Sequence, residues 1–257
     1  MIKVTAVPAF SDNYIWLIGR ENNPHVALVD PGDHAPVLAF MRKHGLTPCA
    51  ILITHHHRDH IGAIAGLLDE YDIPVYGPKL ERIPHMSHPL AEGDIVALEA
   101  IDATFRVIDT PGHTAGHICY YSDRSLFCGD TLFTCGCGRL FEGTAEQMQR
   151  SLAKIRALPD DTRVYCAHEY TLANIGFALV ADPDNRALQA RREQDTATRG
   201  RGEPTVPSLL GLEKQTNPFL RWDDKNLIGA AEKFMGKRLN SPAEIFGAIR
   251  YWKDTLD

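Results

Sequence analysis

The stretch that most constrains this chain is ILITHHHRDHIGAI, from Ile51 to Ile64, because it crowds four histidines and an aspartate into seven positions. Its first residues are apolar and β-branched, which predicts a buried strand. Alternate side chains of an extended segment share a face. If the strand continues past Thr54, His55 and His57 point one way and His56 points the other.

Asp59 and His60 come next, where the segment from Ile61 to Tyr71 begins a helical period. A carboxylate at the start of a helix interacts favourably with the exposed backbone N–H groups. One strand-to-helix turn can therefore present two imidazoles to one point and an Asp/His pair to a neighbouring point. Zinc and similar divalent ions favour neutral imidazole and carboxylate ligands. The alternative for this stretch alone is a solvated surface loop.

Three more ligand-type side chains stand far along the chain. His113 lies in the Gly-rich DTPGHTAGH, Asp130 in LFCGDTL and His168 in RVYCAHEY. Each follows an expected strand, and α/β folds gather their sites at the carboxyl ends of strands. Taken singly, each could be a helix cap or a histidine satisfied by backbone. Together with the histidine-rich turn, they supply enough ligands for two metal ions.

Local patterns predict a mixed α/β domain followed by a helical one. We expect strands at 3–7, 14–18, 25–29, 49–53, 75–76, 94–98, 105–108, 116–121, 125–128 and 163–166. We expect helices at 35–44, 61–71 and 144–158, then at 172–180, 185–198, 227–235 and 242–252. Mixed strands and helices suggest helices covering stacked sheets. The predicted domains are residues 1–169, catalytic, and 170–257, mainly helical and substrate-binding.

Composition narrows the class of protein. A net charge of -6 argues against a nucleic-acid partner or an anionic membrane surface. The longest notable apolar run, Ile61 to Leu68, is far shorter than the ~18 residues of a membrane span. The first residues resemble neither a secretion signal nor a transit peptide, so we expect a cytoplasmic protein. In that compartment the cysteines are expected as thiols. The lone C-x-C of Cys135 and Cys137 is weak evidence for a metal site.

The spacing T-H-x-H-x-D-H, then G-H, then G-D, then a final H resembles the metallo-β-lactamase superfamily. The resemblance covers roughly the first two thirds of the chain and implies an αββα sandwich with a dinuclear metal site. It also implies the ligands by position: His55, His57 and His113 for one metal, Asp59, His60 and His168 for the other, and Asp130 bridging both. His56 is expected to face away. His117 and Asp30 are candidates to support the ligands by hydrogen bonds, and a turn or cap role is the equal alternative for Asp30.

Longer motifs are similar to the glyoxalase II, or hydroxyacylglutathione hydrolase, family. They include FSDNYIWLI, GDTLFTCGCGRLFEGTAEQM and PTVPSLLGLEKQTNPFLR, and they span nearly the whole chain. The resemblance implies hydrolysis of S-D-lactoylglutathione to D-lactate and glutathione in methylglyoxal detoxification. A metal-bridging hydroxide would attack the thioester, with Asp59 as a candidate proton acceptor. We expect two divalent metal ions per chain, zinc first, with iron or manganese as alternatives, and we expect a monomer.

The family places glutathione contacts at positions that match Arg139, Phe141, Tyr170, Arg250 and Lys253. Glutathione carries two carboxylates, so cations suit its site. Phe141 departs from members with tyrosine there, which puts its role in doubt. Arg250 and Lys253, spaced by three, share a face if their segment is helical. The alternatives are a solvated helix face for these two residues and packing at the domain junction for Tyr170.

Three rival functions remain at this stage. The first is another hydrolase with the same metal core, such as a lactamase, which would be expected with a secretion signal, or a nuclease, which would want a basic surface. The second is a glutathione persulfide dioxygenase with one iron, against which the second set of ligands and the helical tail argue. The third is a non-catalytic metal-binding or regulatory protein, which a complete ligand set disfavours.

Overall fold

The computed structural model describes residues 2–256, which form two compact units. The first unit runs to Asp109 and includes Thr114–Gly129. The second unit comprises Thr110–His113 and the chain from Asp130 onward. The expected division into a catalytic domain, residues 1–169, and a mainly helical substrate-binding domain, residues 170–257, stays a prediction.

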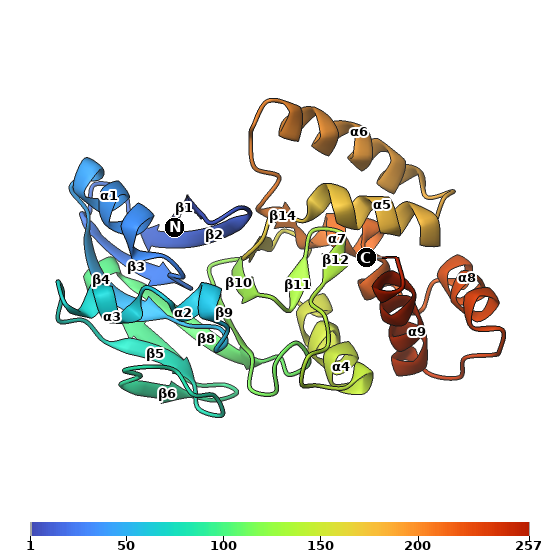
Figure 1. The fold of residues 1–257 in the computed structure, drawn as a ribbon, viewed down its shortest axis with the longest axis horizontal. Coiled ribbons are helices and arrows are strands. Elements are labelled where there is room, and N and C mark those ends of the chain that lie inside the picture. The colour runs from blue at the N-terminus through green and yellow to red at the C-terminus, as the bar shows by residue number, and fades with distance from the viewer. Residues whose placement is uncertain (1, 257) are drawn as a thin grey trace. The chain divides into compact units, whose positions relative to one another are not determined.

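The first unit contains a six-stranded sheet in the order β1 to β6 (Figure 1). The strands are β1 (Lys3–Ala9), β2 (Asn13–Gly19), β3 (His25–Val29), β4 (Thr47–Leu52), β5 (Val75–Pro78) and β6 (His88–Leu90). The first three strands pair antiparallel, and β3 to β6 pair parallel. The parallel pairing aligns the carboxyl ends of β3 and β4, after which Asp30 and the histidine-rich turn follow.

Two helices cover one face of this sheet, α1 (His34–His44) and α3 (Ile64–Leu68), with the short α2 (Arg58–Ile61) before α3. Their apolar side chains, including Met41 and Leu67, form one buried cluster with strand residues such as Leu28 and Ile51. Burying such side chains is the main stabilising contribution to a sheet covered by helices. Asp33 caps α1 by accepting from the amide of Ala35, and Gly45 ends the helix in the left-handed conformation.

A second group of strands in the first unit pairs antiparallel in the order β7, β8, β9, β10. They are β7 (Ile95–Leu98), β8 (Ala103–Asp109), β9 (Ile118–Ser122) and β10 (Ser125–Gly129), with η1 (Glu99–Ile101) between β7 and β8. The two groups of strands are joined by polar contacts. Tyr120 donates from its hydroxyl to the carbonyl of Ile53 at 2.9 Å, and Ile118 N donates to the carbonyl of Thr54 at 2.9 Å. The strand that precedes the histidines is therefore supported by β9.

The second unit is mainly helical (Figure 1). Its helices are α4 (Ala145–Arg156), α5 (Thr171–Ala181), α6 (Arg186–Gly200), α7 (Leu210–Thr216), η2 (Pro218–Leu220), α8 (Lys225–Met235) and α9 (Pro242–Asp254). Its strands are the hairpin β11 (Leu132–Phe133) and β12 (Gly136–Cys137), and the antiparallel pair β13 (Arg163–Cys166) and β14 (Ser208–Leu209). No helix among residues 2–256 combines the length and the apolar character needed to cross a membrane.

The largest departure from the sequence expectation is the segment at 61–71. Instead of one helix it forms α2 and α3 with a break at Gly62 and Ala63. The amide of Ala63 donates to the carbonyl of Pro31 at 2.9 Å, outside the helix, which interrupts the helical ladder. The expectation of a single helix was wrong because this tertiary hydrogen bond replaces a local one.

The core cluster of the first unit can be tested at Ile51, which is fully buried on β4. Replacing Ile51 by alanine should lower the free energy of unfolding by about 3 kcal/mol, because it removes buried methylenes and leaves a cavity. Ile95→Thr, at a position 59% exposed on β7, is the control and should have a small effect. Urea denaturation followed by circular dichroism measures both; equal losses would contradict this description of the core.

Candidate metal centre

The end of β4 is fixed by Asp30, which is buried just beyond β3. Its Oδ1 accepts from the amide of Thr54 at 2.8 Å, and its Oδ2 accepts from the Thr54 hydroxyl at 2.7 Å. The same Oδ2 lies 3.1 Å from Nδ1 of His60. Because Nδ1 faces Asp30, Nε2 of His60 is turned to the other side of the ring, where it lies 3.5 Å from Oδ2 of Asp59.

The first turn of α2 is held against the loop after Asp30 by close backbone packing. A Cβ on Gly32 would lie 1.7 Å from the carbonyl oxygen of Asp59, so this approach is open only to glycine. It places Asp59 and His60 beside the end of β4. This requirement explains the glycine of the sequence DPGD.

Four potential ligands of the first unit gather around this turn. Nε2 of His55 lies 3.1 Å from Nδ1 of His57, and the rings of His55 and His60 lie 4.0 Å apart between centroids. Asn13, on β2, donates from Nδ2 to Oδ2 of Asp59 at 3.0 Å. His55 and His60 are buried, whereas His57 and Asp59 are partly exposed. These two partly exposed side chains leave the cluster accessible from solvent.

The second unit gathers the other three predicted ligands around one carboxylate. Oδ2 of Asp130 lies 3.3 Å from Nε2 of His113, and Oδ1 lies 3.4 Å from Nε2 of His168. All three side chains are buried. Nδ1 of His113 lies 2.9 Å from the carbonyl of Arg139, which selects the tautomer that donates from Nδ1 and keeps the Nε2 lone pair available. The two oxygens of Asp130 thus face two different imidazoles.

These spacings fit ligands of divalent cations. Two ligands bound about 2.0–2.1 Å from one tetrahedral ion lie roughly 3.3 Å from each other. The contacts within each unit fall between 3.1 and 3.5 Å. Burying this many imidazole and carboxylate groups together is unfavourable unless a cation or protons compensate. The chain therefore carries two His/Asp clusters that together supply ligands suited to a dinuclear metal site.

His56 and His117, the other two histidines considered from the sequence, have different surroundings. His56 faces away from the cluster and its Nδ1 lies 3.0 Å from Oε2 of the buried Glu81. Glu81, which the sequence did not single out, also accepts from the hydroxyl of Thr114 and the amide of Gly116 and so anchors the Gly-rich loop. The fully buried His117 stacks on His55 at 4.8 Å. His117 thus lies beside a potential ligand without joining the ligand clusters.

The C-x-C pair has no metal-site geometry. Sγ of Cys135 lies 3.6 Å from the Thr216 hydroxyl, and Sγ of Cys137 lies 3.8 Å from an Arg250 nitrogen. Burial raises the pKa of the Cys135 thiol to about 12 and that of Cys137 to about 11. At neutral pH both are therefore protonated, and neither belongs to a metal-donor cluster in the described part of the chain. All six cysteines are thiols there, as expected.

The residues predicted to contact glutathione differ widely in exposure, and all lie in the second unit. Phe141 is 62% exposed, and Tyr170 is 38% exposed with its ring stacked on His168 at 4.7 Å. Arg250 and Lys253 on α9 are only 2% and 8% exposed. The alternative of a solvated helix face is therefore wrong for both. Arg250 donates to the carbonyl of Cys137 at 3.1 Å and to Asp254 at 2.7 Å.

Comparison with known proteins shows the family of this fold. Residues 10–168 match the family model for the metallo-beta-lactamase superfamily, and residues 169–256 match the model described as hydroxyacylglutathione hydrolase C-terminus. A hydroxyacylglutathione hydrolase of Nitrosomonas eutropha is 53% identical over 256 residues, covering 100% of both chains. Another, from Alkalilimnicola ehrlichii, is 53% identical and covers 99% of both chains.

Solved structures resemble the chain in fold. ETHE1 from Myxococcus xanthus has a TM-score of 0.65 and 25% identity, with 99% of each chain covered. TTHA1623 in a di-iron-bound form has a TM-score of 0.59 and 28% identity, with 85% of this chain and 100% of the other covered. The chain is a metallo-β-lactamase superfamily protein, which confirms the predicted fold class. Within that class, it belongs to the hydroxyacylglutathione hydrolase family.

The contact between Asp30 and His60 predicts that metal affinity depends on Asp30. If His60 is a ligand, Asp30→Asn should weaken metal binding there by about 10- to 100-fold, because the amide supports the imidazole less well than the carboxylate. Asp33→Asn, three positions away, is the control because asparagine caps a helix as well as aspartate does. Competition with a chelator measures the affinity; equal affinity in the two variants would contradict the role of Asp30.

Proposed function

We propose that this chain is a dinuclear-metal thioesterase that hydrolyses S-D-lactoylglutathione and related 2-hydroxyacylglutathiones to D-lactate and glutathione, as a step of methylglyoxal detoxification. The observation that carries the proposal is the full-length likeness to hydroxyacylglutathione hydrolases, which includes the C-terminal region specific to that family. The two His/Asp clusters supply the chemistry that such a hydrolase requires.

We assign the ligands as the sequence predicted. His55, His57 and His113 hold one ion, Asp59, His60 and His168 hold the other, and Asp130 bridges the two. The bridging role is supported by the two oxygens of Asp130, each of which faces a different histidine ring at 3.3 or 3.4 Å. Zinc is our first assignment for the ions, with iron and manganese as alternatives, since all three accept imidazole and carboxylate ligands.

When bound, two such ions lower the pKa of a coordinated water to about 7 and polarise the thioester carbonyl. The side chains of this chain orient the reaction. Asp59 is our candidate proton acceptor, and the hydrogen bond from Asn13 to its Oδ2 fixes the orientation of that carboxylate. Tyr170, stacked on His168, restricts the motion of that imidazole and presents a hydroxyl for the peptide part of the substrate.

The glutathione moiety requires cations and donors. Lys253 and the exposed Arg139 supply cations for its two carboxylates. Arg250, which is already bonded to Cys137 and Asp254, has fewer donors left to offer, so we assign it a mixed role in substrate contact and in support of the hairpin. Phe141, which is largely exposed, offers an apolar surface without a hydroxyl. We further propose that the protein acts in the cytoplasm as a monomer without a nucleic-acid partner.

The activity is tested by supplying purified protein with S-D-lactoylglutathione and following thioester loss with and without a chelator. We expect turnover that the chelator abolishes and that added zinc restores. His113→Ala should lower kcat at least about 100-fold because it removes a ligand that positions the reactive centre. His25→Ala, an exposed histidine at the start of β3, is the control. Absence of turnover by the fully metallated protein would contradict the proposed function.

The substrate assignment is tested at Lys253. Lys253→Met keeps the length of the side chain and removes its charge. KM should rise about 10-fold, the value of a charge-assisted hydrogen bond, with little change in kcat. Lys233→Met on the exposed face of α8 is the matched control. An unchanged KM in Lys253→Met would show that this cation does not bind glutathione.

A further inference from the structure

The hairpin of β11 and β12 is buried, and its backbone polar groups need hydrogen-bond partners that the proposed mechanism does not account for. Every residue from Thr131 to Gly138 is buried, so the backbone polar groups of the turn cannot bond to solvent. Cys135 adds a second demand, because its backbone is in the left-handed region at φ 53°, where a residue with a side chain is strained. The turn therefore needs partners from elsewhere in the chain.

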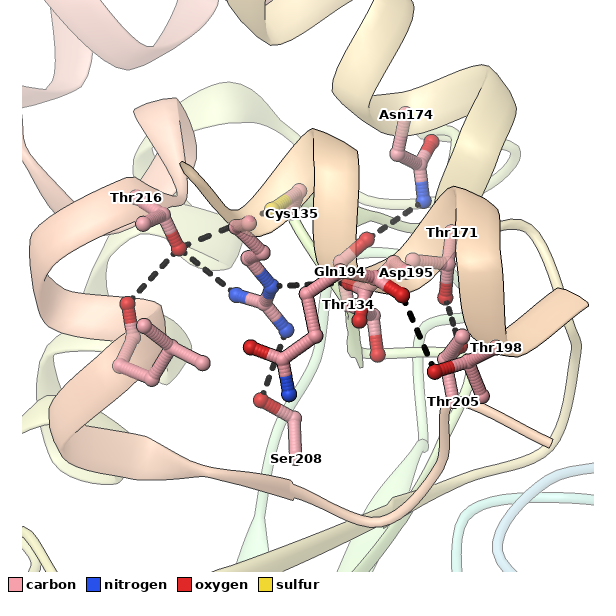
Figure 2. A network of polar contacts seen from close by, with 12 residues as sticks. Thr134, Cys135, Thr171, Asn174, Gln194, Asp195, Thr198, Thr205, Ser208 and Thr216 are labelled. Atoms are coloured by element: carbon pink, nitrogen blue, oxygen red, sulfur yellow. Dashed lines mark hydrogen bonds and ion pairs between the residues drawn. The ribbon is translucent and has the colours of Figure 1, made fainter. Parts of the chain in front are cut away.

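Side chains of the C-terminal helices supply those partners. Glu213 on α7 accepts from the amide of Cys135 at 2.9 Å. Asn174 on α5 donates to the carbonyl of Thr134 at 3.0 Å (Figure 2). Asn217, just after α7, donates to the carbonyls of Phe133 and Gly136 at 3.0 and 2.9 Å. The buried turn is thus satisfied almost wholly by side chains from the region that matches the family's C-terminal model.

Glu213 is fully buried and is itself held by Arg191 on α6, at 2.6 Å. The guanidinium of Arg191 also donates to Thr216, Ser208 and Asp195; these three residues are labelled in Figure 2. Burial lowers the pKa of Arg191, but the combined effect of Glu213, Cys135 and Asp195 is larger and raises it. Arg191 is therefore charged, and its contact with Oε1 of Glu213 fixes the orientation of that side chain while Oε2 faces the amide of Cys135.

The hairpin in turn touches two of the proposed ligands. A Cβ on Gly138, directly after β12, would lie 2.0 Å from the carbonyl oxygen of Asp130 and 2.8 Å from Nδ1 of His113. The next residue, Arg139, presents the carbonyl that faces Nδ1 of His113 at 2.9 Å. Any shift of the hairpin therefore displaces the groups that set the orientation of both ligands.

We propose that Glu213, fixed by Arg191, is a positioning residue for the metal centre: through the amide of Cys135 it holds the hairpin that orients His113 and Asp130. This inference rests on the proposed function, because it assigns a task in building the same site. Neither residue touches an ion or the substrate. Their effect passes through the backbone of residues 135–139.

The test compares Glu213→Gln with Asp182→Asn. Asp182 pairs with Arg221 at 2.6 Å in the same unit, and both of these side chains are largely buried, so the control removes a similar carboxylate away from the hairpin. Three quantities are measured: the affinity for Zn²⁺ by chelator competition, the visible absorption of the Co²⁺-loaded protein, and kcat and KM for S-D-lactoylglutathione. The melting temperature of the metal-free proteins measures the loss of stability alone.

We expect Glu213→Gln to weaken Zn²⁺ binding and to lower kcat by about 10- to 100-fold, the usual effect of losing support behind a ligand. Its Co²⁺ spectrum should change, and KM should change little. Asp182→Asn should lower the melting temperature but keep wild-type affinity, spectrum and kcat. Wild-type metal properties in Glu213→Gln would overturn the inference, as would equal losses in both variants, since these would reflect stability alone.

If Glu213→Gln does not fold, Asn174→Ala replaces it, because that change removes a single hydrogen bond to Thr134. The same shifts in affinity and spectrum are expected, and their absence would overturn the inference. Failure of the proposed function has a different signature. In that case the wild-type protein itself, loaded with metal, would not hydrolyse the thioester, whereas failure of this inference leaves wild-type activity intact.

Discussion

Imidazole nitrogens and carboxylate oxygens packed 3.1 to 3.5 Å apart in largely buried surroundings are the arrangement on which the rest of this structure depends. Without a cation or bound protons, such clusters would carry uncompensated lone pairs and negative charge in a poorly solvated site. Other polar groups of the chain hold these side chains in position. Asp30 supports His60, the carbonyl of Arg139 supports His113, and Asn13 supports Asp59. Each of these contacts fixes the orientation of a potential ligand side chain. The close contacts between the potential ligands would by themselves disfavour that orientation.

The features that sequence predicted well are those encoded by local rules. Strand β13 was expected at 163–166 and lies there, and β10 was expected at 125–128 and extends one residue further, to Gly129. Alternation along the extended segment after β4 correctly separated His56 from its neighbours, since His56 pairs with Glu81. Asp30 was a candidate to support a ligand by a hydrogen bond, with a turn or cap role as the equal alternative, and its Oδ2 lies 3.1 Å from Nδ1 of His60.

What the sequence did not predict depends on contacts between distant segments. Glu213 and Cys135 are 78 positions apart, and nothing local marks that glutamate as buried, so α7 and its polar partners were missed. The break between α2 and α3 falls at Gly62 and Ala63, where the amide of Ala63 bonds to the distant carbonyl of Pro31. The short strands β6, β11, β12 and β14 were missed because two or three residues carry too little periodicity to be recognised. For Arg250 and Lys253, helical spacing gave the shared face but not its burial.

Within the second unit, the elements that support the hairpin also carry the cations proposed for glutathione. Arg250 shows the overlap most directly, since it bonds the carbonyl of Cys137 at the end of β12 and lies one helical turn from Lys253. A variant that removes the charge of Arg250 would therefore lose both a hairpin contact and a proposed substrate cation. Changes in kcat and KM of that variant would not distinguish the two roles. Lys253, at 8% exposure on the same helix, is proposed only as a substrate cation. If the proposed glutathione contacts are correct, one helical region both supports the hairpin through its side chains and supplies substrate cations, which gives a physical reason for the two family segments to occur in one chain.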